Sequence, residues 1–306
     1  MSRLSDTDLP TARVVPQSAS AVPAVPPRRR RLRRGYAGQI AVGAVLSVLV
    51  FVGLFPFLFM FAASFKTNRE FYDSYWVPTW PLVWGNYGSA WRQIQPYFVT
   101  TVIAAAISIA GILLLASTAA FVFARYDFFG RKALFGLIAC LLMVPGISSL
   151  IPLFVFSREL GVLNTRIVLV FPHVAGGTVL ATILIKTFVE GIPQELFDAA
   201  RVDGAGGVRM FGYMMLPLSL PVIGTVALLT VIGVWNDFFW PLLTVSDNSL
   251  RTISVGLSFF QGQNVTNWGP LFAGYTLASV PLLLLFIFLS KYFLAGIQGG
   301  VPGGSK

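Results

Sequence analysis

Charged residues are scarce in this sequence. Only 11% of its 306 residues are Asp, Glu, Lys or Arg, while 56% are hydrophobic. Ordinary globular domains carry about 25% charged residues. Mean hydropathy is correspondingly high, at +0.75. A water-soluble globular domain is therefore excluded, and the composition predicts an integral membrane protein.

Cysteine and histidine are almost absent. Cys140 is the single cysteine, which excludes a disulfide framework within the chain. His173 is the single histidine and cannot build a metal cluster alone. No G-x-x-x-x-G-K-[ST] phosphate loop occurs, and the C-terminal "GGVPGGSK" has Lys and Ser in the wrong order. The sequence therefore predicts no metal site and no cofactor on this chain.

Positive charge is concentrated at the N-terminus. Residues 1–34 hold eight arginines against Asp6 and Asp8, which gives +6 of the formal net charge of +10. Rich in Pro, Ser and Ala, this segment cannot bury enough apolar surface to fold, so we expect it to be disordered. We do not expect a cleavable signal, because the apolar run that follows is too long for a signal h-region and lacks a clear cleavage site. Because it adjoins an apolar stretch, membrane lipids are the expected partner and nucleic acid is not.

Long apolar runs make up most of the remaining chain. A helix needs roughly 20 apolar residues to cross a bilayer core. Continuously apolar segments also disfavour a membrane β-barrel, whose strands alternate. The sequence predicts an all-α membrane protein with six transmembrane helices, near residues 40–63, 98–124, 133–156, 167–189, 214–236 and 270–290.

The distribution of Lys and Arg predicts the orientation. With the N-terminus inside, 16 of the 22 basic residues lie on the cytoplasmic side, as the positive-inside rule requires. The first outer loop, "YDSYWVPTWPLVWGNYGSAW", carries the Trp and Tyr typical of a membrane interface. Trp235, Trp240 and Trp268 are predicted to lie near the outer ends of the last two spans. Both termini are therefore expected in the cytoplasm.

A charged, glycine-marked segment interrupts the apolar runs at residues 191–217. Pro193 can start a helix, and "QELFDAARVDGA" supplies about three turns. Gly204 is predicted to end that helix in a left-handed conformation, followed by Gly206 and Gly207. A second helical stretch, "VRMFGYMMLPLSLP", leads back to the membrane. The segment is either a solvated connection or a short helix across the cytoplasmic mouth.

The same segment resembles a known motif. "DAARVDGAGGVRMFGYMMLPLS" is similar to the EAA loop of binding-protein-dependent ABC importers. Two features depart from that pattern: Asp198 replaces the usual Glu, and Gly206-Gly207 replace the usual small residue and Pro. The residues matching the loop, and so implied to couple the permease to its ATPase, are Asp198, Ala199, Ala200, Asp203, Gly204, Ala205, Phe211 and Pro217.

Further motifs extend the resemblance over nearly the whole membrane region. "GNYGSAW", "WNDFFWPLL", "LRTISVGLSFFQG" and "YFLAGIQGGVPGG" are similar to elements of maltose-type permeases. The last departs from the family at Val301-Pro302-Gly303, where a Lys usually lies near the end. On these motifs the chain is identified as a member of the carbohydrate-uptake permease branch.

The resemblance implies a fold, a location and partners. The fold is that of a type I ABC importer permease in the bacterial or archaeal cytoplasmic membrane. The implied division is a basic tail at 1–34, a permease domain at 35–294 containing the coupling segment 191–217, and a cytoplasmic tail at 295–306. The implied partners are a second homologous permease, an ATPase dimer that holds ATP and Mg, an extracellular or periplasmic substrate-binding protein and a sugar or polyol substrate.

A possible substrate path runs through His173, Trp235, Asn236 and Asp237. Ionisable groups within spans are often functional, and aromatic faces beside an amide and an acid suit sugar binding. The alternatives are an interhelical hydrogen bond for His173 and an interfacial anchor for Asp237. As a whole-protein alternative, an ion-driven secondary transporter is disfavoured because the first three predicted spans contain no charge. A membrane enzyme is disfavoured because no catalytic pair converges within the spans.

Overall fold

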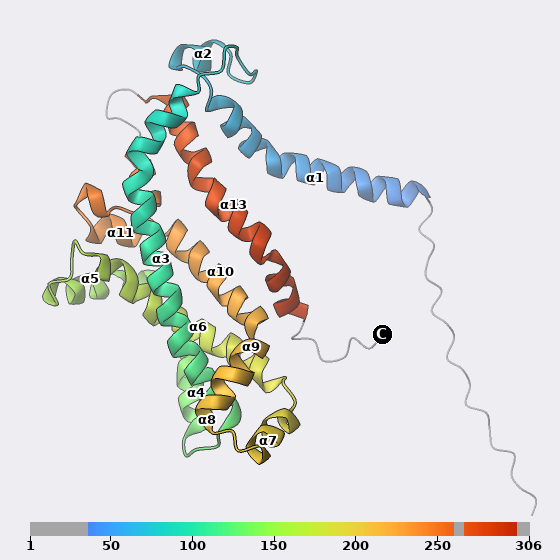
Figure 1. Cartoon of the computed structure of the whole chain (residues 1–306). Coiled ribbons are helices and arrows are strands. Elements are labelled where there is room, and N and C mark those ends of the chain that lie inside the picture. The colour runs from blue at the N-terminus through green and yellow to red at the C-terminus, as the bar shows by residue number, and fades with distance from the viewer. Residues whose placement is uncertain (1–35, 260–265, 299–306) are drawn as a thin grey trace, which may run out of the picture. The chain divides into compact units, whose positions relative to one another are not determined.

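A computed structural model describes residues 36–259 and 266–298, and these form helices joined by turns and short loops (Figure 1). The chain divides into two units, residues 1–52 and 53–306. The first unit contains the beginning of α1 (Tyr36–Ala63), a helix whose residues 38–58 are exposed. The predicted tail at 1–34 lies outside the described residues. At the other end α13 (Trp268–Gln298) includes the first four residues of the predicted C-terminal tail.

The predicted spans are found, although two of them are broken. Within the described residues, four helices are long and apolar enough to cross a membrane: residues 38–63 of α1, α3 (Gly85–Arg125), α6 (Arg166–Glu190) and residues 268–288 of α13. Two bent helix pairs bring the total to as many as six. The fold class predicted from the apolar runs is thus confirmed. α3 is longer than predicted and begins within the aromatic outer loop.

The third span is not one continuous helix. α4 (Arg131–Leu141) and the segment Gly146–Glu159, which includes α5 (Leu150–Glu159), meet at an angle of 88°. Pro145 lies at the break, where its backbone is extended, and a 3-10 turn over Gly146–Ser149 follows. Proline has no N–H to continue the hydrogen-bond ladder. The predicted span over 133–156 is thus present as a bent pair of helices, and the Pro145-Gly146 pair, whose residues disfavour a continuous helix, lies where it bends.

The fifth span is also divided. The stretch Gly207–Leu218 consists of α8 (Gly207–Met210), a π-helical turn (Phe211–Met215) and α9 (Leu216–Leu218), and it meets α10 (Leu220–Asn236) at 74°. Prolines at 217 and 221 flank Ser219 at the bend. In a continuous helix each proline ring would clash with the carbonyl of the residue four positions earlier. The prediction of one helix over 214–236 was therefore wrong at Ser219.

Small residues allow the central helices of the second unit to approach closely. α3 packs along α6, and α10 and α13 pack against α3 (Figure 1). A Cβ on Gly177 of α6 would lie 2.5 Å from Cδ1 of Ile112 on α3. A Cβ on Gly111 would lie 2.9 Å from Val174. Small residues at crossing points are typical of packing between membrane helices, where backbone approach supplies the contact energy.

Two predicted interfacial tryptophans are instead buried. Trp235 and Trp240 are each only 6% exposed. Nε1 of Trp240, on α11 (Phe239–Thr244), donates to the carbonyl of Val168 at 2.7 Å. The indole N–H is thus satisfied inside the protein rather than at the membrane surface. By contrast Trp76, Trp80 and Trp84 of the outer loop are 66–83% exposed, as expected for an interfacial belt.

A buried lysine organises the first outer loop. Lys66 is 1% exposed, and its Nζ donates to the backbone carbonyls of Ser74 and Tyr75. Burial lowers the pKa of this amine. Asn86 donates to the carbonyls of Ser64 and Lys66, at 2.8 and 2.9 Å. These bonds hold both the start of α3 and the loop after α2 (Asn68–Asp73) against the segment 64–66.

Lys66→Met should destabilise this loop. The substitution preserves most of the apolar volume but leaves two part-buried carbonyls without their charged donor, which costs about 1–3 kcal/mol of unfolding free energy. Thermal unfolding of the purified chain in detergent measures the change. Arg69→Met is the matched control: the Arg69 side chain is 92% exposed in a surface pair with Asp73, so its removal should cost less than about 1 kcal/mol. Equal stability of both variants would contradict the anchoring role of Lys66.

Candidate functional site

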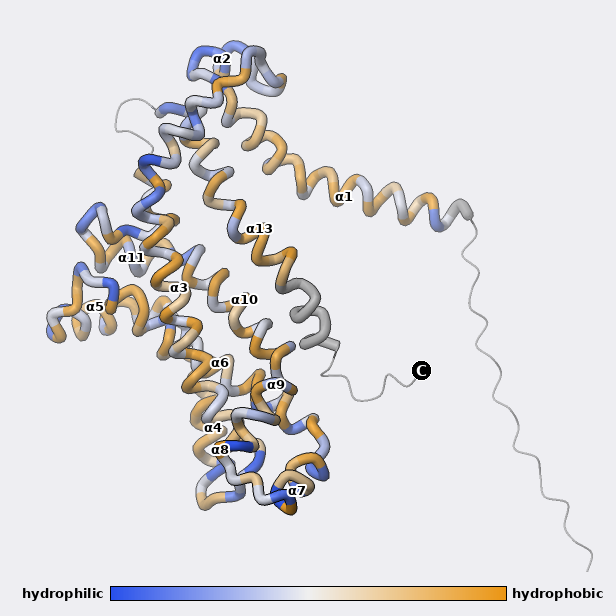
Figure 2. Tube along the Cα trace, viewed as in Figure 1, coloured by the Kyte–Doolittle hydropathy of each residue, from blue (hydrophilic) through white to orange (hydrophobic). Residues whose placement is uncertain are grey.

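The predicted coupling segment forms a short amphipathic helix at one end of the second unit. α7 (Gln194–Val202) lies beyond the C-terminal end of α3 in Figure 1. Its Phe197 is 1% exposed and packs into a cluster formed by α3, α6 and the 207–216 stretch. On its outer side Leu196 is 46% exposed and Val202 89%. Figure 2 shows hydrophilic residues concentrated around α7 and α8, while α10 and α13 are largely hydrophobic. α7 therefore presents a free face outside the apolar region.

The end of α7 is fixed by a glycine in the left-handed conformation. Gly204 has φ +80°, as predicted. Its N–H donates to the carbonyl of Arg201 at 3.0 Å, and that of Ala205 donates to the carbonyl of Ala200 at 2.8 Å. These bonds satisfy carbonyls that the helix end would otherwise leave without partners. Pro193 is the residue just before the helix rather than its first residue.

Arg125 ties α7 to the end of α3. Its guanidinium donates to the carbonyls of Val189 and Ile192, the latter at 2.7 Å, and to Oε1 of Gln194 at 2.7 Å. The same group lies 4.0 Å from the centroid of the Phe197 ring. In the sequence, Arg125 is predicted only as one of the basic residues on the cytoplasmic side. An arginine in the last turn of an otherwise uncharged span is the signal that could have indicated a helix-end anchor.

The residues matching the EAA loop divide into two groups. Asp198, Ala199, Asp203 and Gly204 are exposed on or just after α7, and Pro217 is exposed on α9. Ala200, Ala205 and Phe211 are partly buried against the hydrophobic cluster below. Asp198 accepts from Arg201 at 3.0 Å and from Gln194 at 3.1 Å. Its carboxylate is 56% exposed and remains accessible to another protein.

Gly207 explains one departure from the family pattern. A Cβ at this position would lie 2.6 Å from the hydroxyl oxygen of Tyr126. Tyr126 follows Arg125 at the end of α3 and packs edge-on against Phe121, at 5.7 Å between ring centroids. A side chain at position 207 would displace that ring. The glycine thus accommodates a close contact between α3 and α8.

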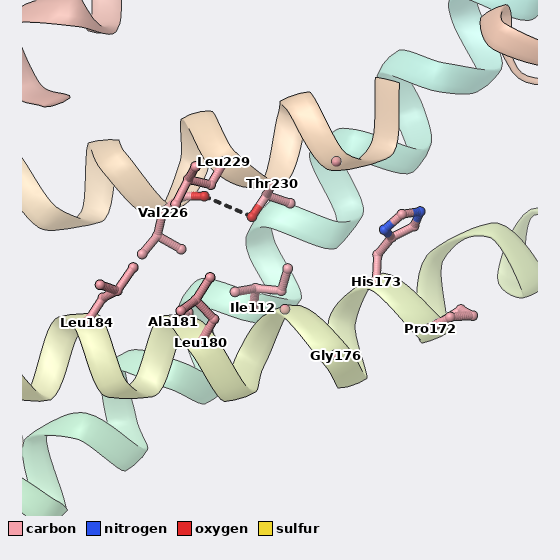
Figure 3. A pocket seen from close by; sticks show the side chains of 12 residues that line it. Ile112, Pro172, His173, Gly176, Leu180, Ala181, Leu184, Val226, Leu229 and Thr230 are labelled. Carbon is pink, nitrogen blue, oxygen red and sulfur yellow. Dashed lines mark hydrogen bonds between the residues drawn. The ribbon is translucent and has the colours of Figure 1, made fainter. Parts of the chain in front are cut away.

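In the predicted substrate path, the side chains of His173 and Asp237 lie within hydrogen-bonding distance of each other. Nε2 of His173, on α6, lies 3.1 Å from Oδ2 of Asp237, which follows α10. The two side chains are 22% and 19% exposed. His173 also lines a cavity of about 250 Å³ between α6 and α10, together with Thr230 and Gly233 (Figure 3). The structure therefore brings together two of the four residues of the possible substrate path.

The other two residues of that path lie elsewhere. Trp235 is buried in a cluster with α3 and α13, where its ring meets Phe98 edge-on at 5.7 Å. Asn236 is exposed, and its amide donates back to the carbonyl of Ile232 at 2.9 Å. Neither lines the cavity that His173 borders. Within the described residues, no group of three or more His, Cys, Asp or Glu side chains could hold a metal ion.

Comparison with known proteins identifies the family. The family described as "Binding-protein-dependent transport system inner membrane component" matches residues 112–299. The chain belongs to this family. It is accordingly a multi-pass inner-membrane permease of an ABC importer and not an enzyme. A permease of this kind operates with an ATPase and a substrate-binding protein.

Curated relatives of this permease cover almost its whole length. It is 33% identical over 277 residues to the "Probable ABC transporter permease protein YurM" of Bacillus subtilis, covering 89% of this chain and 91% of that one. It is 30% identical to the "Trehalose/maltose transport system permease protein MalG" of Thermococcus litoralis, covering 87% and 96%. The "Melibiose/raffinose/stachyose import permease protein MelC" of Bacillus subtilis is 29% identical, with 81% and 91% covered.

A solved structure supports the fold of the permease. A chain of a bacterial ABC transporter involved in the import of the acidic polysaccharide alginate matches with a TM-score of 0.75 at 20% identity. The match covers 85% of this chain and 98% of that one. The overall arrangement of helices is thus one that a chain of an ABC importer adopts.

Proposed function

We propose that this permease moves a sugar, oligosaccharide or related polyol into the cell, energised by a separate ATPase subunit that docks on α7. The observation that carries the coupling role is the geometry of α7: a capped helix, fixed to α3 by Arg125, whose outer face and Asp198 carboxylate are exposed. The names of relatives, which include a melibiose/raffinose/stachyose and a trehalose/maltose permease, support the substrate class. ATP and Mg belong to the partner, and this chain needs no cofactor of its own.

A permease without nucleotide chemistry needs a rigid docking element through which the ATPase can move its helices. The small residues Ala199 and Gly204 let another protein's surface approach closely, and Asp198 can pair with a cation on it. Closure of two ATPase subunits around ATP would then move α7. Because α7 is tied to α3 and α6 through Arg125, that movement would reach the helices bordering the cavity beside His173.

A second homologous permease would complete the substrate path. The cavity of about 250 Å³ beside His173 is smaller than the roughly 300–1,000 Å³ typical of ligand sites. α4 contains no buried residue within this chain, so its apolar side chains need lipid or another permease to cover them. His173 on the cavity's border, and Asp237 at 3.1 Å from it, supply groups able to hydrogen-bond sugar hydroxyls.

We propose that both termini lie in the cytoplasm, so that α7 faces the ATPase. Single cysteines at Ser18 and Ser246, in a background with Cys140 replaced, should then differ in labelling by a membrane-impermeant thiol reagent added to intact cells. We expect labelling at position 246 and none at position 18 until the cells are opened. Labelling at position 18 in intact cells would contradict the orientation and remove α7 from the ATPase side.

The proposed energy source is tested separately from the substrate. Uptake should stop when the phosphate-loop lysine of the partner ATPase is replaced while the ion gradient stays intact. Continued uptake under these conditions would favour an ion-driven secondary transporter. Ligand screening of the binding protein encoded beside this gene then identifies the substrate, and binding only to non-carbohydrate ligands would contradict the proposed class.

A further inference from the structure

The cavity beside His173 is built from one face of each of two helices. Residues spaced three or four positions apart line it from both sides: His173, Gly176 and Leu180 on α6, and Val226, Thr230 and Gly233 on α10. That spacing places each set on one side of its helix. Figure 3 shows the His173 side chain reaching from α6 toward α10. The cavity therefore lies where these two helix faces meet.

The two ends of the cavity differ in character. At one end Nε2 of His173 contacts Asp237, and Nδ1 forms no hydrogen bond within the described part of the chain. At the other end Leu184 and Val226 belong to the hydrophobic cluster beside α7. The Thr230 hydroxyl between them donates to the carbonyl of Val226 at 2.9 Å, so its hydrogen is already used. His173 is thus the side chain of this lining that can donate to or accept from a ligand through a free ring nitrogen.

Gly176 and Gly233 have neither a backbone reason nor a packing reason to be glycine. Neither adopts the left-handed conformation, and a Cβ at either position would meet no atom within 4 Å. The neighbouring Gly177 differs, because a Cβ there would lie 2.5 Å from Ile112. Glycine is also a poorer helix former than alanine or valine. The missing side chains of Gly176 and Gly233 therefore serve the width of the cavity that both residues line.

We infer that Gly176 and Gly233 set which substrates pass, by keeping the cavity wide enough for a single sugar ring. One ring hydroxyl would bond to Nδ1 of His173, and the C–H face of the ring would lie against the apolar lining. The inference rests on the proposed function as a sugar permease. A mostly apolar lining with few polar groups is typical of small-molecule sites. Weak contacts also suit a transport path, because the substrate must leave as well as enter.

Thiol reagents of two sizes test the width of the cavity. Thr230→Cys is introduced into the assembled transporter after its other cysteines, Cys140 included, have been replaced. Its reaction rate is measured with methyl methanethiosulfonate and with a methanethiosulfonate that carries a glucose ring. We expect both reagents to react. Adding Gly176→Val or Gly233→Val should slow the glucose reagent about tenfold, because a branched side chain overfills the space, and should leave the methyl reagent unchanged.

Two further sets of variants make the result specific. Gly176→Ala and Gly233→Ala add a single carbon atom each and should slow the glucose reagent less than the valine variants do. Gly136→Val is the matched control, because Gly136 lies on α4 outside the cavity and a Cβ there also meets no atom within 4 Å. It should leave both rates unchanged.

Several outcomes would overturn the inference. If Thr230→Cys with both glycines intact reacted with neither reagent, or with the methyl reagent alone, the cavity would not admit a sugar ring. An unchanged glucose-reagent rate in both valine variants would remove the role of the glycines. Loss of the second permease from the purified valine variants would show that the glycines accommodate a partner helix instead. Uptake of the substrate by the wild-type complex is measured in parallel, so the proposed function can stand even where the role of this cavity fails.

Discussion

Asp198→Lys and Gly204→Val should each reduce transport at least tenfold while leaving the permease in the membrane. The Asp198 carboxylate is more than half exposed, and its pair with Arg201 lies at the surface, where such pairs contribute less than about 1 kcal/mol to stability. A positive charge there would repel a cation of the ATPase groove. At Gly204, with φ +80°, a β-branched residue would cost about 1–3 kcal/mol and distort the end of α7. Uptake and binding-protein-stimulated ATP hydrolysis measure the loss.

Conservative variants separate coupling from folding. Asp198→Glu restores the acid usual in the EAA loop and should preserve transport. Gly204→Asn should be tolerated far better than Gly204→Val, because asparagine adopts the left-handed conformation more readily. If both Asp198→Lys and Gly204→Val kept the ATPase bound and fully stimulated, the segment would be only a connection between two spans.

Arg125→Met should uncouple the permease by loosening α7 rather than by changing its exposed face. The substitution removes donors to the carbonyls of Val189 and Ile192 and to Gln194, along with the cation over the Phe197 ring. Hydrogen bonds from a charged group contribute about 1.5–3 kcal/mol each. We expect backbone amides of α7 to exchange hydrogen at least tenfold faster, and transport to fall by a similar factor.

Two further variants make that result specific. Arg125→Lys keeps the charge but loses the planar fork that reaches three acceptors, so it should give an intermediate result. Arg209→Met removes a nearby exposed arginine and should leave exchange in α7 unchanged. Wild-type exchange and wild-type transport in Arg125→Met would contradict the anchoring role.

Sequence reasoning could predict what depends on composition and local chemistry. Apolar runs located the membrane segments, and Pro193 and Gly204 marked the limits of α7 because their backbone preferences are local. The size of each bend was not predictable: the breaks of 88° after Leu141 and 74° at Ser219 join segments that together are apolar enough to form one span. Proline signals were present at both breaks, but proline inside α6 and α13 leaves those helices continuous.

Contacts between residues far apart in the chain could not be predicted from the sequence either. His173 and Asp237 are 64 positions apart, and nothing in their local patterns pairs them. Arg125 and Gln194 are separated by 69 positions, so the anchor of α7 emerges only once α3 and α6 are packed together. Trp240 looked like an interfacial residue because tryptophan favours both interfaces and well-bonded interiors. The hydrogen bond from its indole N–H to the carbonyl of Val168 shows that Trp240 lies in the interior.

The central claim is that the outer face of α7 contacts the ATPase, and site-specific crosslinking tests it most directly. A photoreactive group is attached to a cysteine at Val202, which is 89% exposed on α7, in the assembled transporter with Cys140 replaced. The same group at Trp80, 83% exposed in the outer loop, is the control. The account predicts a crosslink to the ATPase from position 202 and none from position 80. Absence of an ATPase crosslink from position 202 in an active, assembled transporter would contradict it.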